Sequence, residues 1–307
     1  MTFIDPRLTE RRNPRSADID LATPLEIVDI MSAEDQTVPD AVASQREPIA
    51  RAVEQAETTF RNGGRLFYVG AGTSGRLGVL DASECPPTFG TDPEMVQGII
   101  AGGHKALTRS QEGAEDRLEG AVEDLMQHGV RGGDFVVGIA ASGTTPYVRR
   151  ALTYARSIGA ATALVACSPP PTDALDVVDI LIMPLTGPEV VTGSTRMKAG
   201  TATKLVLNTI TTGAMIRLGK TFGNLMVDLR ATNDKLRDRS ERILMEVCEV
   251  DRAAARTLLE RSGGTVKTAI VMHFLGADRE EAGRVLDGAG GVIRRVLDRA
   301  PPPVQSP

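Results

Sequence analysis

Two glutamates of this chain lie where acid–base chemistry would need them, close behind polar, glycine-containing segments. Glu84 follows the turn Gly70-Ala-Gly-Thr-Ser-Gly75, and Glu115 lies in Glu112-Gly-Ala-Glu-Asp116. They are 115 − 84 = 31 residues apart, the length of one strand–helix–strand step, so both can reach the same edge of a sheet. Two carboxylates in one cleft can act as general base and general acid once their surroundings separate their pKa values.

Each glutamate also has competing explanations. A carboxylate such as Glu115 near the start of a helix is favourable with the helix dipole, without any catalytic role. Asp81 and Asp116 are rival carboxylates that spacing alone does not exclude.

The turn before Glu84 has the outline of a phosphate-binding loop. An apolar run, Leu66–Val69, enters it, and a helical pattern, Leu77–Ala82, leaves it before a Pro-Pro pair expected to stop the helix. Backbone N–H groups at a helix start are unpaired and favour anions, and Thr73 and Ser74 add hydroxyl donors. The pattern G-x-x-x-x-G-K-[ST] is absent and G-x-G-x-x-G is a weak signal, so a tight strand-to-helix turn is an equally good interpretation.

A second dense polar stretch, Gly187–Lys204, leads into a long predicted helix. Ser194 or Thr195 is expected to cap that helix. Arg196 and Lys198 would supply the local positive charge that an anionic ligand needs in a chain with a net charge of −5. Capping and solvation of the first helical turn are the alternative explanation.

The elements that must position these residues alternate between strand and helix, which predicts a parallel sheet with right-handed crossovers. Strands buried on both faces are predicted at 66–69, 95–100, 135–140, 163–166 and 180–184. Helices are predicted at 16–31, 39–61, 77–82, 113–128, 147–158 and 197–218, with none or a very short one at 169–178. Ligands of such sheets bind beyond the carboxyl ends of the strands, where the segments at 70–75, 101–104 and 141–145 are all rich in Gly, Ser or Thr.

The pattern changes toward both ends of the chain. Residues 1–64 are predicted to form an N-terminal helical arm, whose first 16 residues are polar and expected to be poorly anchored unless a partner holds them. Residues 65–239 are expected to form the α/β domain, and 240–300 a small all-helical C-terminal subdomain. Its helices are predicted at 242–250, 252–261, 266–275, 279–286 and 292–297. Residues 222–235 are expected to run from loop into helix, and the Pro-rich tail 301–307 to be disordered.

Composition argues against several classes of protein. With 3% aromatic residues and a net charge of −5, the 307-residue chain does not resemble a nucleic-acid binder. Its three cysteines and three histidines are scattered, which gives no disulfide framework and no metal site. The sequence shows no signal peptide and no apolar run long enough to cross a membrane, so a cytoplasmic protein without membrane contact is expected.

Taken together, these segments resemble the N-acetylmuramic acid 6-phosphate etherase family. The resemblance extends from about Ile19 to Leu297, and it is carried by Gly70–Pro87, Glu112–Asp116, Gly138–Gly143, Gly187–Lys204 and Phe222–Asp228. It implies an α/β sugar isomerase (SIS) fold, with a five-stranded parallel sheet flanked by helices and a small helical C-terminal piece. It also implies a cytoplasmic homodimer that needs no metal or organic cofactor. Such enzymes cleave the lactyl ether of N-acetylmuramic acid 6-phosphate to N-acetylglucosamine 6-phosphate and D-lactate during cell-wall recycling.

The resemblance implies roles for individual residues. Glu84 matches the family's acid/base glutamate, and Glu115 matches its second catalytic glutamate. The substrate-binding residues expected from the matching loops are Thr73, Ser74, Ser142, Thr144, Thr145, Ser194, Thr195 and Lys198. Ser74, Ser142 and Thr145 match phosphate-binding positions of the wider fold, whereas Thr73 and Thr144 have weaker claims. Relatives often carry Arg at the position of Thr144, so this chain lacks a cation there.

Two further classes of function remain open. The glucokinase regulatory protein shares the Gly-Ser-Thr-Arg-Met-Lys type of signature and is a phosphosugar sensor, although it is much longer. An aldose–ketose isomerase would use the same abstraction of a C2 proton and move it to C1. Release of D-lactate, formation of a ketose phosphate, or neither would distinguish the three.

Overall fold

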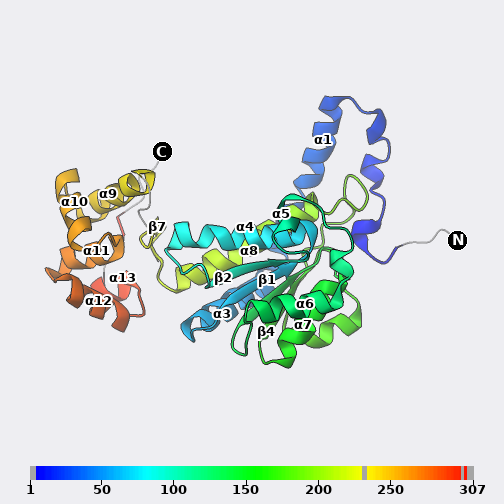
Figure 1. Cartoon of the computed structure of the whole chain (residues 1–307). Coiled ribbons are helices and arrows are strands. Elements are labelled where there is room, and N and C mark those ends of the chain that lie inside the picture. The colour runs from blue at the N-terminus through cyan, green and yellow to red at the C-terminus, as the bar shows by residue number, and fades with distance from the viewer. Residues whose placement is uncertain (1–4, 230–233, 299–300, 303–307) are drawn as a thin grey trace. The chain divides into compact units, whose positions relative to one another are not determined.

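The computed structural model describes residues 5–229, 234–298 and 301–302. The chain divides into two compact units (Figure 1). The first consists of Met1–Ser83 and Glu94–Thr211, and the second of Glu84–Pro93 and Thr212–Pro307. Helices α4 (Gly72–Phe89) and α8 (Lys198–Arg217) each contribute residues to both units.

The first unit is built on a five-stranded sheet with the strand order β2-β1-β3-β4-β5, in which every pair of neighbours is parallel (Figure 1). The strands are β1 (Leu66–Gly70), β2 (Val96–Ile100), β3 (Phe135–Ile139), β4 (Ala161–Val165) and β5 (Ile180–Ile182). All five begin and end within two residues of the predicted segments. The predicted α/β class and five-stranded parallel sheet are confirmed.

Both faces of the sheet are covered, which explains why its strands are apolar at nearly every position rather than alternating. Phe67 and Val69 of β1 point into a core shared with α6 (Leu118–Gln127) and α7 (Pro146–Ser157). Tyr68 points to the other face, where α4 and α8 pack. A Cβ on Gly78 of α4 would lie 2.7 Å from the Tyr68 Cβ, and the Tyr68 hydroxyl lies 3.5 Å from the Leu207 carbonyl oxygen of α8.

Helix α4 is longer than the predicted helix 77–82, and the expectation that the Pro-Pro pair stops it was wrong. It begins at Gly72, inside the glycine turn, and includes Pro86 and Pro87. Proline lacks a backbone N–H and normally breaks a helix interior, but these two residues lie in the last turn, where only two donors are lost. The Gly90 N–H still donates to the Pro86 carbonyl at 2.9 Å.

The N-terminal segment differs from the predicted pattern. The helix expected at 16–31 is replaced by short 3₁₀ turns, η2 (Pro14–Ser16) and η3 (Ile19–Leu21), followed by α1 (Pro24–Asp35). Helix α1 begins at Pro24 because Thr23 and Glu26 form a capping box, a signal that hydrophobic spacing did not reveal. The helix expected at 39–61 is divided into α2 (Val38–Ala43) and α3 (Arg46–Arg61).

Residues 5–16 are held in place, contrary to the expectation of a poorly anchored end. The first 3₁₀ turn is η1 (Leu8–Glu10), and the Leu8 N–H donates to Ser168 Oγ at 2.8 Å. The Thr9 carbonyl accepts from the Gly193 N–H at 3.1 Å, and Ser16 Oγ donates to the Val190 carbonyl at 2.7 Å. This segment therefore runs along the loop at 188–193.

Two connections between strands are shorter or more broken than regular helices. The helix predicted at 113–128 is a 3₁₀ turn, η4 (Ala114–Asp116), followed by α6, and a one-turn helix, α5 (Lys105–Thr108), precedes both. Between β4 and β5 the connection is the 3₁₀ segment η5 (Thr172–Val177), which confirms that a regular helix is missing there.

The second unit is helical, with a separate hydrophobic core that includes Phe222, Leu244 and Ile270. It contains α9 (Asp234–Cys248), α10 (Arg252–Arg261), α11 (Val266–Leu275), α12 (Arg279–Gly288) and α13 (Ile293–Leu297). Asp251 and Asp278 cap α10 and α12 by accepting from the backbone N–H groups of Ala254 and Glu281. The predicted segment 222–235 overlaps a short hairpin of β6 (Thr221–Phe222) and β7 (Leu225–Met226) that was not predicted, and its residues 230–233 lie outside the described residues. The tail expected to be disordered lies, after Pro302, outside the described residues.

The three cysteines, Cys85, Cys167 and Cys248, are all buried. Burial raises the pKa of the Cys167 thiol to about 12, so this group is a packing residue and not a nucleophile. None of the described helices is both long and apolar enough to cross a membrane.

Candidate functional site

The polar loops after β1, β2 and β3 emerge from one edge of the sheet. The register pairs Gly70 with Ile100 on one side and with Ile139 on the other, so these three strands end level with one another. Ile139 in turn pairs with Val165 of β4. The carboxyl ends of a parallel sheet are where ligands bind in folds of this class, and the glycine- and hydroxyl-rich turns lie there.

The first loop is shaped by glycines. A Cβ on Gly70 would lie 2.6 Å from the Gly75 backbone nitrogen, and a Cβ on Gly75 would lie 2.6 Å from Ile100 Cγ1. Gly72 has a φ of +54°, which side chains disfavour, and faces open space. Helix α4 therefore starts directly after the end of β1, at Gly72.

The polar side chains of this first loop differ in whether they form hydrogen bonds. Thr73 and Ser74 are partly buried, and within the described residues their hydroxyls make no hydrogen bond. The Arg76 guanidinium instead donates to the carbonyls of Ala106 and Leu107, at 2.8 and 3.0 Å. Arg76 therefore ties α4 to α5 and does not point at an anion.

The third loop presents a pair of hydroxyls. Ser142 Oγ lies 2.8 Å from Thr144 Oγ1 and also accepts from the Thr144 N–H at 3.2 Å. Thr145 occupies the N-cap position of α7, but its side chain makes no capping bond. Thr144 is thus bonded to the same serine that was predicted to bind phosphate.

The stretch 187–198 meets the first loop near Gly200. A Cβ on Gly200 would lie 3.4 Å from the Thr195 carbonyl oxygen and 3.7 Å from the Thr73 methyl carbon. Ser194 and Thr195 are partly buried. The structure thus brings two of the predicted hydroxyl-bearing segments together at the start of α8.

The cap of α8 is not the one predicted. Its first N–H groups are bound by a buried carboxylate, Glu189, which accepts from Lys198 N at 3.0 Å and from Ala199 N at 2.9 Å. Sequence reasoning missed this role and expected Ser194 or Thr195 to cap the helix. Glu189 is an acidic residue nine positions before Lys198, which could have indicated the cap. The sequence of the loop between them does not show that it folds back onto the helix start.

Lys198 does not offer a free cation. Its side chain is 2% exposed, and its ammonium donates to Glu34 Oε2 at 2.5 Å. Asn13 Nδ2 donates to the same carboxylate oxygen at 2.8 Å, and Arg15 pairs with the other oxygen at 2.5 Å. Its charge is thus balanced inside the protein, and the expectation that Lys198 contacts substrate stays a prediction.

Glu115 lies beside the loop after β2. Its side chain is exposed in η4, the 3₁₀ turn that directly follows Gly113. Gly113 has a φ of +71°. The neighbouring Ala114 Cβ lies 3.3 Å from where a Cβ on Gly102 would be, so η4 packs against the end of β2. Asp116, the rival carboxylate in the same turn, is exposed as well.

Glu84 is exposed on α4, in the part of the helix that belongs to the second unit, whereas Glu115 belongs to the first. The pairing of the two carboxylates therefore stays a prediction. The rival Asp81 is buried and accepts from Thr211 Oγ1 at 3.2 Å. Burial raises the pKa of Asp81, against the hydrogen bonds from Thr211 and Tyr68 and the charge of Lys204, which lower it.

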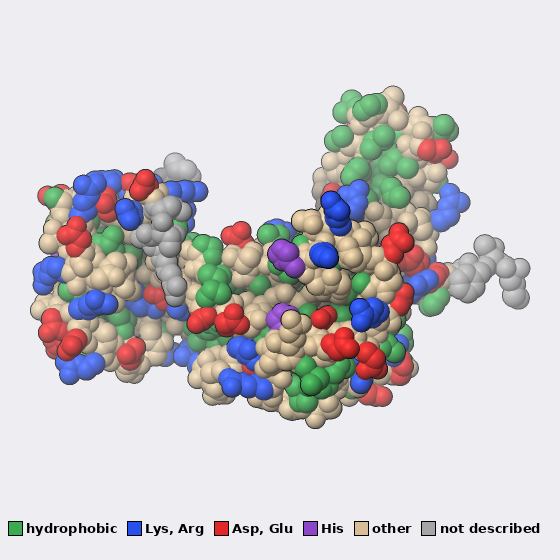
Figure 2. Space-filling model, viewed as in Figure 1, with side chains coloured by type: hydrophobic (Ala, Val, Ile, Leu, Met, Phe, Trp, Pro, Cys, Tyr) green, Lys and Arg blue, Asp and Glu red, His purple; other side chains and the backbone are tan. Residues whose placement is uncertain are grey.

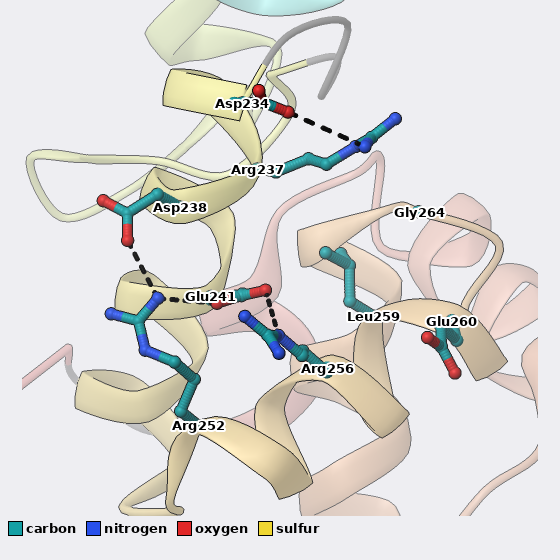
Figure 3. A pocket seen from close by; sticks show the side chains of 9 residues that line it. All are labelled: Asp234, Arg237, Asp238, Glu241, Arg252, Arg256, Leu259, Glu260 and Gly264. Carbon is teal, nitrogen blue, oxygen red and sulfur yellow. Dashed lines mark hydrogen bonds and ion pairs between the residues drawn. The ribbon is translucent and has the colours of Figure 1, made fainter.

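The helical unit has a cavity of its own, about 740 Å³ in volume, between α9 and α10 (Figure 3). Its charged side chains pair with one another. Arg252 binds both Asp238 and Glu241, Arg256 binds Glu241, and Arg237 approaches Asp234. The bridging carboxylates leave little free charge for a phosphorylated ligand, and none of the predicted site residues lines this cavity.

Comparison with known proteins gives long matches over almost the whole chain. The N-acetylmuramic acid 6-phosphate etherase of Gloeobacter violaceus is 54% identical over 293 residues, which cover 95% of each chain. That of Rhodopirellula baltica is 54% identical over 94% of this chain and 95% of its own, and that of Edwardsiella ictaluri is 52% identical over 96% and 98%.

Two further comparisons cover only part of the chain. A family model described as the glucokinase regulatory protein N-terminal SIS domain matches residues 48–156. The solved structure of phosphoheptose isomerase from Neisseria gonorrhoeae is 18% identical, with a TM-score of 0.45 over 62% of this chain and 98% of that one. Identity above one half over nearly the full length of both chains decides the question of family: this protein is a member of the N-acetylmuramic acid 6-phosphate etherase family.

Proposed function

We propose that this protein cleaves the D-lactyl ether of N-acetylmuramic acid 6-phosphate, giving N-acetylglucosamine 6-phosphate and D-lactate during cell-wall recycling. The observation that carries the proposal is the 54% identity to an etherase over 95% of both chains. The arrangement of the strand-end loops agrees with a phosphorylated sugar as ligand, because unbonded hydroxyls and helix N–H groups lie at the edge where such ligands bind.

The chemistry needs proton transfer rather than a metal. An unactivated alkoxide is a poor leaving group, but opening of the sugar ring makes C1 an aldehyde and the C2 proton acidic. A base removes that proton, the C3–O bond to lactate breaks with electrons leaving on oxygen, and an acid protonates the departing oxygen. Water then adds at C3 of the unsaturated aldehyde, and C2 regains a proton. Two carboxylates are sufficient for these transfers.

We propose that Glu84 and Glu115 supply these two carboxylates. Both are exposed, so each can exchange protons with substrate or water. The buried Asp81 is a weaker candidate because Thr211 already donates to it. The assignment requires the two glutamates to meet at one substrate, and kinetics of single variants test it.

The phosphate is assigned to the start of α4 and to the loop after β3. Thr73, Ser74, Ser142, Thr144 and Thr145 supply hydroxyls there. Ser194 and Thr195 would contact the sugar from the start of α8, where Thr195 borders Thr73 near Gly200.

Isotope labelling tests the reaction directly. Purified protein is incubated with N-acetylmuramic acid 6-phosphate, and D-lactate is measured with a lactate dehydrogenase, beside a control without protein. In H₂¹⁸O the lactate should stay unlabelled, since the ether oxygen leaves with it. In D₂O the sugar product should carry deuterium at C2. Labelled lactate or protium retained at C2 would contradict the elimination.

A sensor of phosphosugars is the second candidate, because the regulatory-protein domain matches residues 48–156. That match includes β1, β2 and β3 but ends before β4 and β5, whereas the etherases match nearly end to end. Binding of the phosphosugar without lactate release would favour the sensor, and formation of a ketose phosphate would favour an isomerase.

We also propose that the protein is a cytoplasmic homodimer. Hydrophobic side chains gather on the N-terminal arm around α1 (Figure 2), and those most exposed are Leu21, Leu25 and Val28, at 83, 71 and 56%. Such a patch favours burial against another chain. Light scattering should give the mass of a dimer for the natural protein and a monomer for a Leu21→Ser/Leu25→Ser variant.

A further inference from the structure

The start of α8 is filled by an anion that the protein itself supplies. Both carboxylate oxygens of Glu189 are used, one on the Lys198 N–H and one on the Ala199 N–H, at 3.0 and 2.9 Å, and the side chain is fully buried. A helix N-terminus attracts anions through its unpaired N–H groups and its dipole. At α8 that attraction is satisfied internally.

The loop that carries Glu189 is fixed from both sides. Asn13 Nδ2 lies 3.4 Å from the Pro188 carbonyl, and Ser16 Oγ donates to the Val190 carbonyl. At the other end of the loop, the Lys198 ammonium binds Glu34 of α1, and both side chains are almost fully buried. Because Ser194 and Thr195 lie between these anchors, their positions depend on the carboxylate and on the ion pair.

The start of α4 offers the opposite situation. Among the described residues, no side chain accepts from the N–H groups of Gly72, Thr73 or Ser74. Gly72 faces open space, and the nearby hydroxyls of Thr73 and Ser74 are unbonded. The chain therefore has two helix starts next to each other near Gly200, one filled and one open.

We propose that Glu189 is a positioning residue that closes the start of α8 to phosphate and holds Ser194 and Thr195 in place, so that a phosphorylated substrate binds in one orientation, with its phosphate at α4. This inference rests on the proposed function for its kinetic test, but not for its binding test. Burial holds the pKa of Glu189 above its ordinary value, and the two N–H groups and the Lys198 charge offset only part of that effect.

The binding test uses inorganic phosphate and no substrate. Removing the carboxylate in Glu189→Ala exposes two N–H groups, so phosphate should raise the melting temperature of this variant more than that of the natural protein. An equal effect of phosphate on both proteins would overturn the closing role. Sodium chloride at equal ionic strength is the control for general salt effects.

The kinetic test separates positioning from simple structural support. Glu189→Ala should raise KM for N-acetylmuramic acid 6-phosphate by about tenfold or more, with a smaller change in kcat. Added formate, which can enter the vacated position, should lower the raised KM of this variant part of the way to the natural value. It should leave the KM of Ser142→Ala unchanged. Natural KM in the folded variant, or a raised KM that formate does not restore, would overturn the proposal.

A second variant decides the matter if Glu189→Ala does not fold. Glu189→Gln keeps the shape but has one carbonyl oxygen for the two N–H groups, so it should fold, raise KM and bind phosphate no better than the natural protein. Natural KM in Glu189→Gln would then overturn the proposal. A natural protein that releases no D-lactate would refute the proposed function alone, because the phosphate measurement would still test Glu189.

Discussion

The ammonium group of Lys198 binds the carboxylate of Glu34 although the two residues are 164 positions apart in the sequence. Their contact is 2.5 Å long, and both side chains are at most 2% exposed. It links α1 of the N-terminal arm to the first residue of α8. A buried pair of this kind holds two elements together mainly because breaking it leaves a charge without a partner.

Breaking this pair should therefore destabilise the first unit strongly. Lys198→Met leaves Glu34 buried with only Asn13 and Arg15 beside it, and a loss of about 3–5 kcal/mol is expected in urea unfolding. The double variant Glu34→Leu/Lys198→Met should recover part of this loss. A double variant as unstable as the sum of its parents would show that the two side chains act independently.

The same pair should make stability depend on pH. Burial by itself raises the pKa of Glu34, but the bonds from Lys198 and Asn13 and the charges of Lys198 and Arg15 outweigh it and hold the pKa below its ordinary 4.5. A lowered carboxyl pKa contributes stability above the unfolded value, and this contribution is lost as the pH falls through the folded value. The difference in unfolding free energy between the natural protein and Glu34→Gln should thus shrink below pH 4.5 and stay level above it. A difference that grows on acidification would contradict this sign.

Replacing either of the two glutamates proposed to be catalytic should abolish most turnover while keeping binding. Glu84→Gln and Glu115→Gln are each expected to lower kcat by about 10²–10⁴-fold, the usual contribution of a general acid or base. D-lactate release measures kcat, and protection of the variant by substrate in thermal unfolding measures binding. Glu112→Gln, at an exposed position in the same loop as Glu115, is the matched control and should keep natural turnover. Near-natural kcat in Glu84→Gln or Glu115→Gln would remove that residue from the mechanism.

Loss of a hydroxyl proposed to bind the phosphate should act on KM. Ser142→Ala removes the partner of Thr144 Oγ1 and one proposed donor to the phosphate, so KM for the phosphorylated sugar should rise by about 3- to 10-fold. Ser157→Ala changes a serine at the other end of α7 and should leave KM unchanged. An unchanged KM in Ser142→Ala would place the phosphate elsewhere.

Two helical glycines should respond in opposite ways to the same substitution. Gly78→Ala puts a methyl group 2.7 Å from the Tyr68 Cβ, which cannot move without moving β1, so destabilisation by about 1–3 kcal/mol is expected. Gly283 in α12 has no neighbour within 4 Å, so Gly283→Ala should stabilise its unit by about 0.4–1 kcal/mol. Thermal unfolding compares the two, and a stabilised Gly78→Ala would show that α4 can move away from the sheet.

Local sequence was sufficient for the sheet. Strands β1 and β3 are short apolar runs that follow a charged residue, Arg65 or Asp134, and burial on both faces removes the ambiguity of side-chain alternation. It was less sufficient for helices whose ends depend on caps. Thr23 and Glu26 start α1 later than the apolar spacing indicated, and α4 continues through Pro86 and Pro87.

The candidate site shows the same division. Hydroxyls at strand ends were predictable, because the ends of parallel strands must meet at one edge. The engagement of Lys198 by Glu34, and the cap that Glu189 provides, were not predictable, because both depend on side chains that meet only after the chain has folded. A lysine in a polar loop looks the same in sequence whether it faces solvent or a distant carboxylate.

The three buried thiols give the protein built-in reporters of opening. Cys167 belongs to the first unit, and Cys85 and Cys248 belong to the second. A thiolate-selective reagent cannot reach them while they are buried. The rate of labelling at each cysteine therefore follows how often the structure around it opens locally. Mass spectrometry of labelled peptides would therefore measure the rate of local opening within each unit separately, in one sample without denaturant.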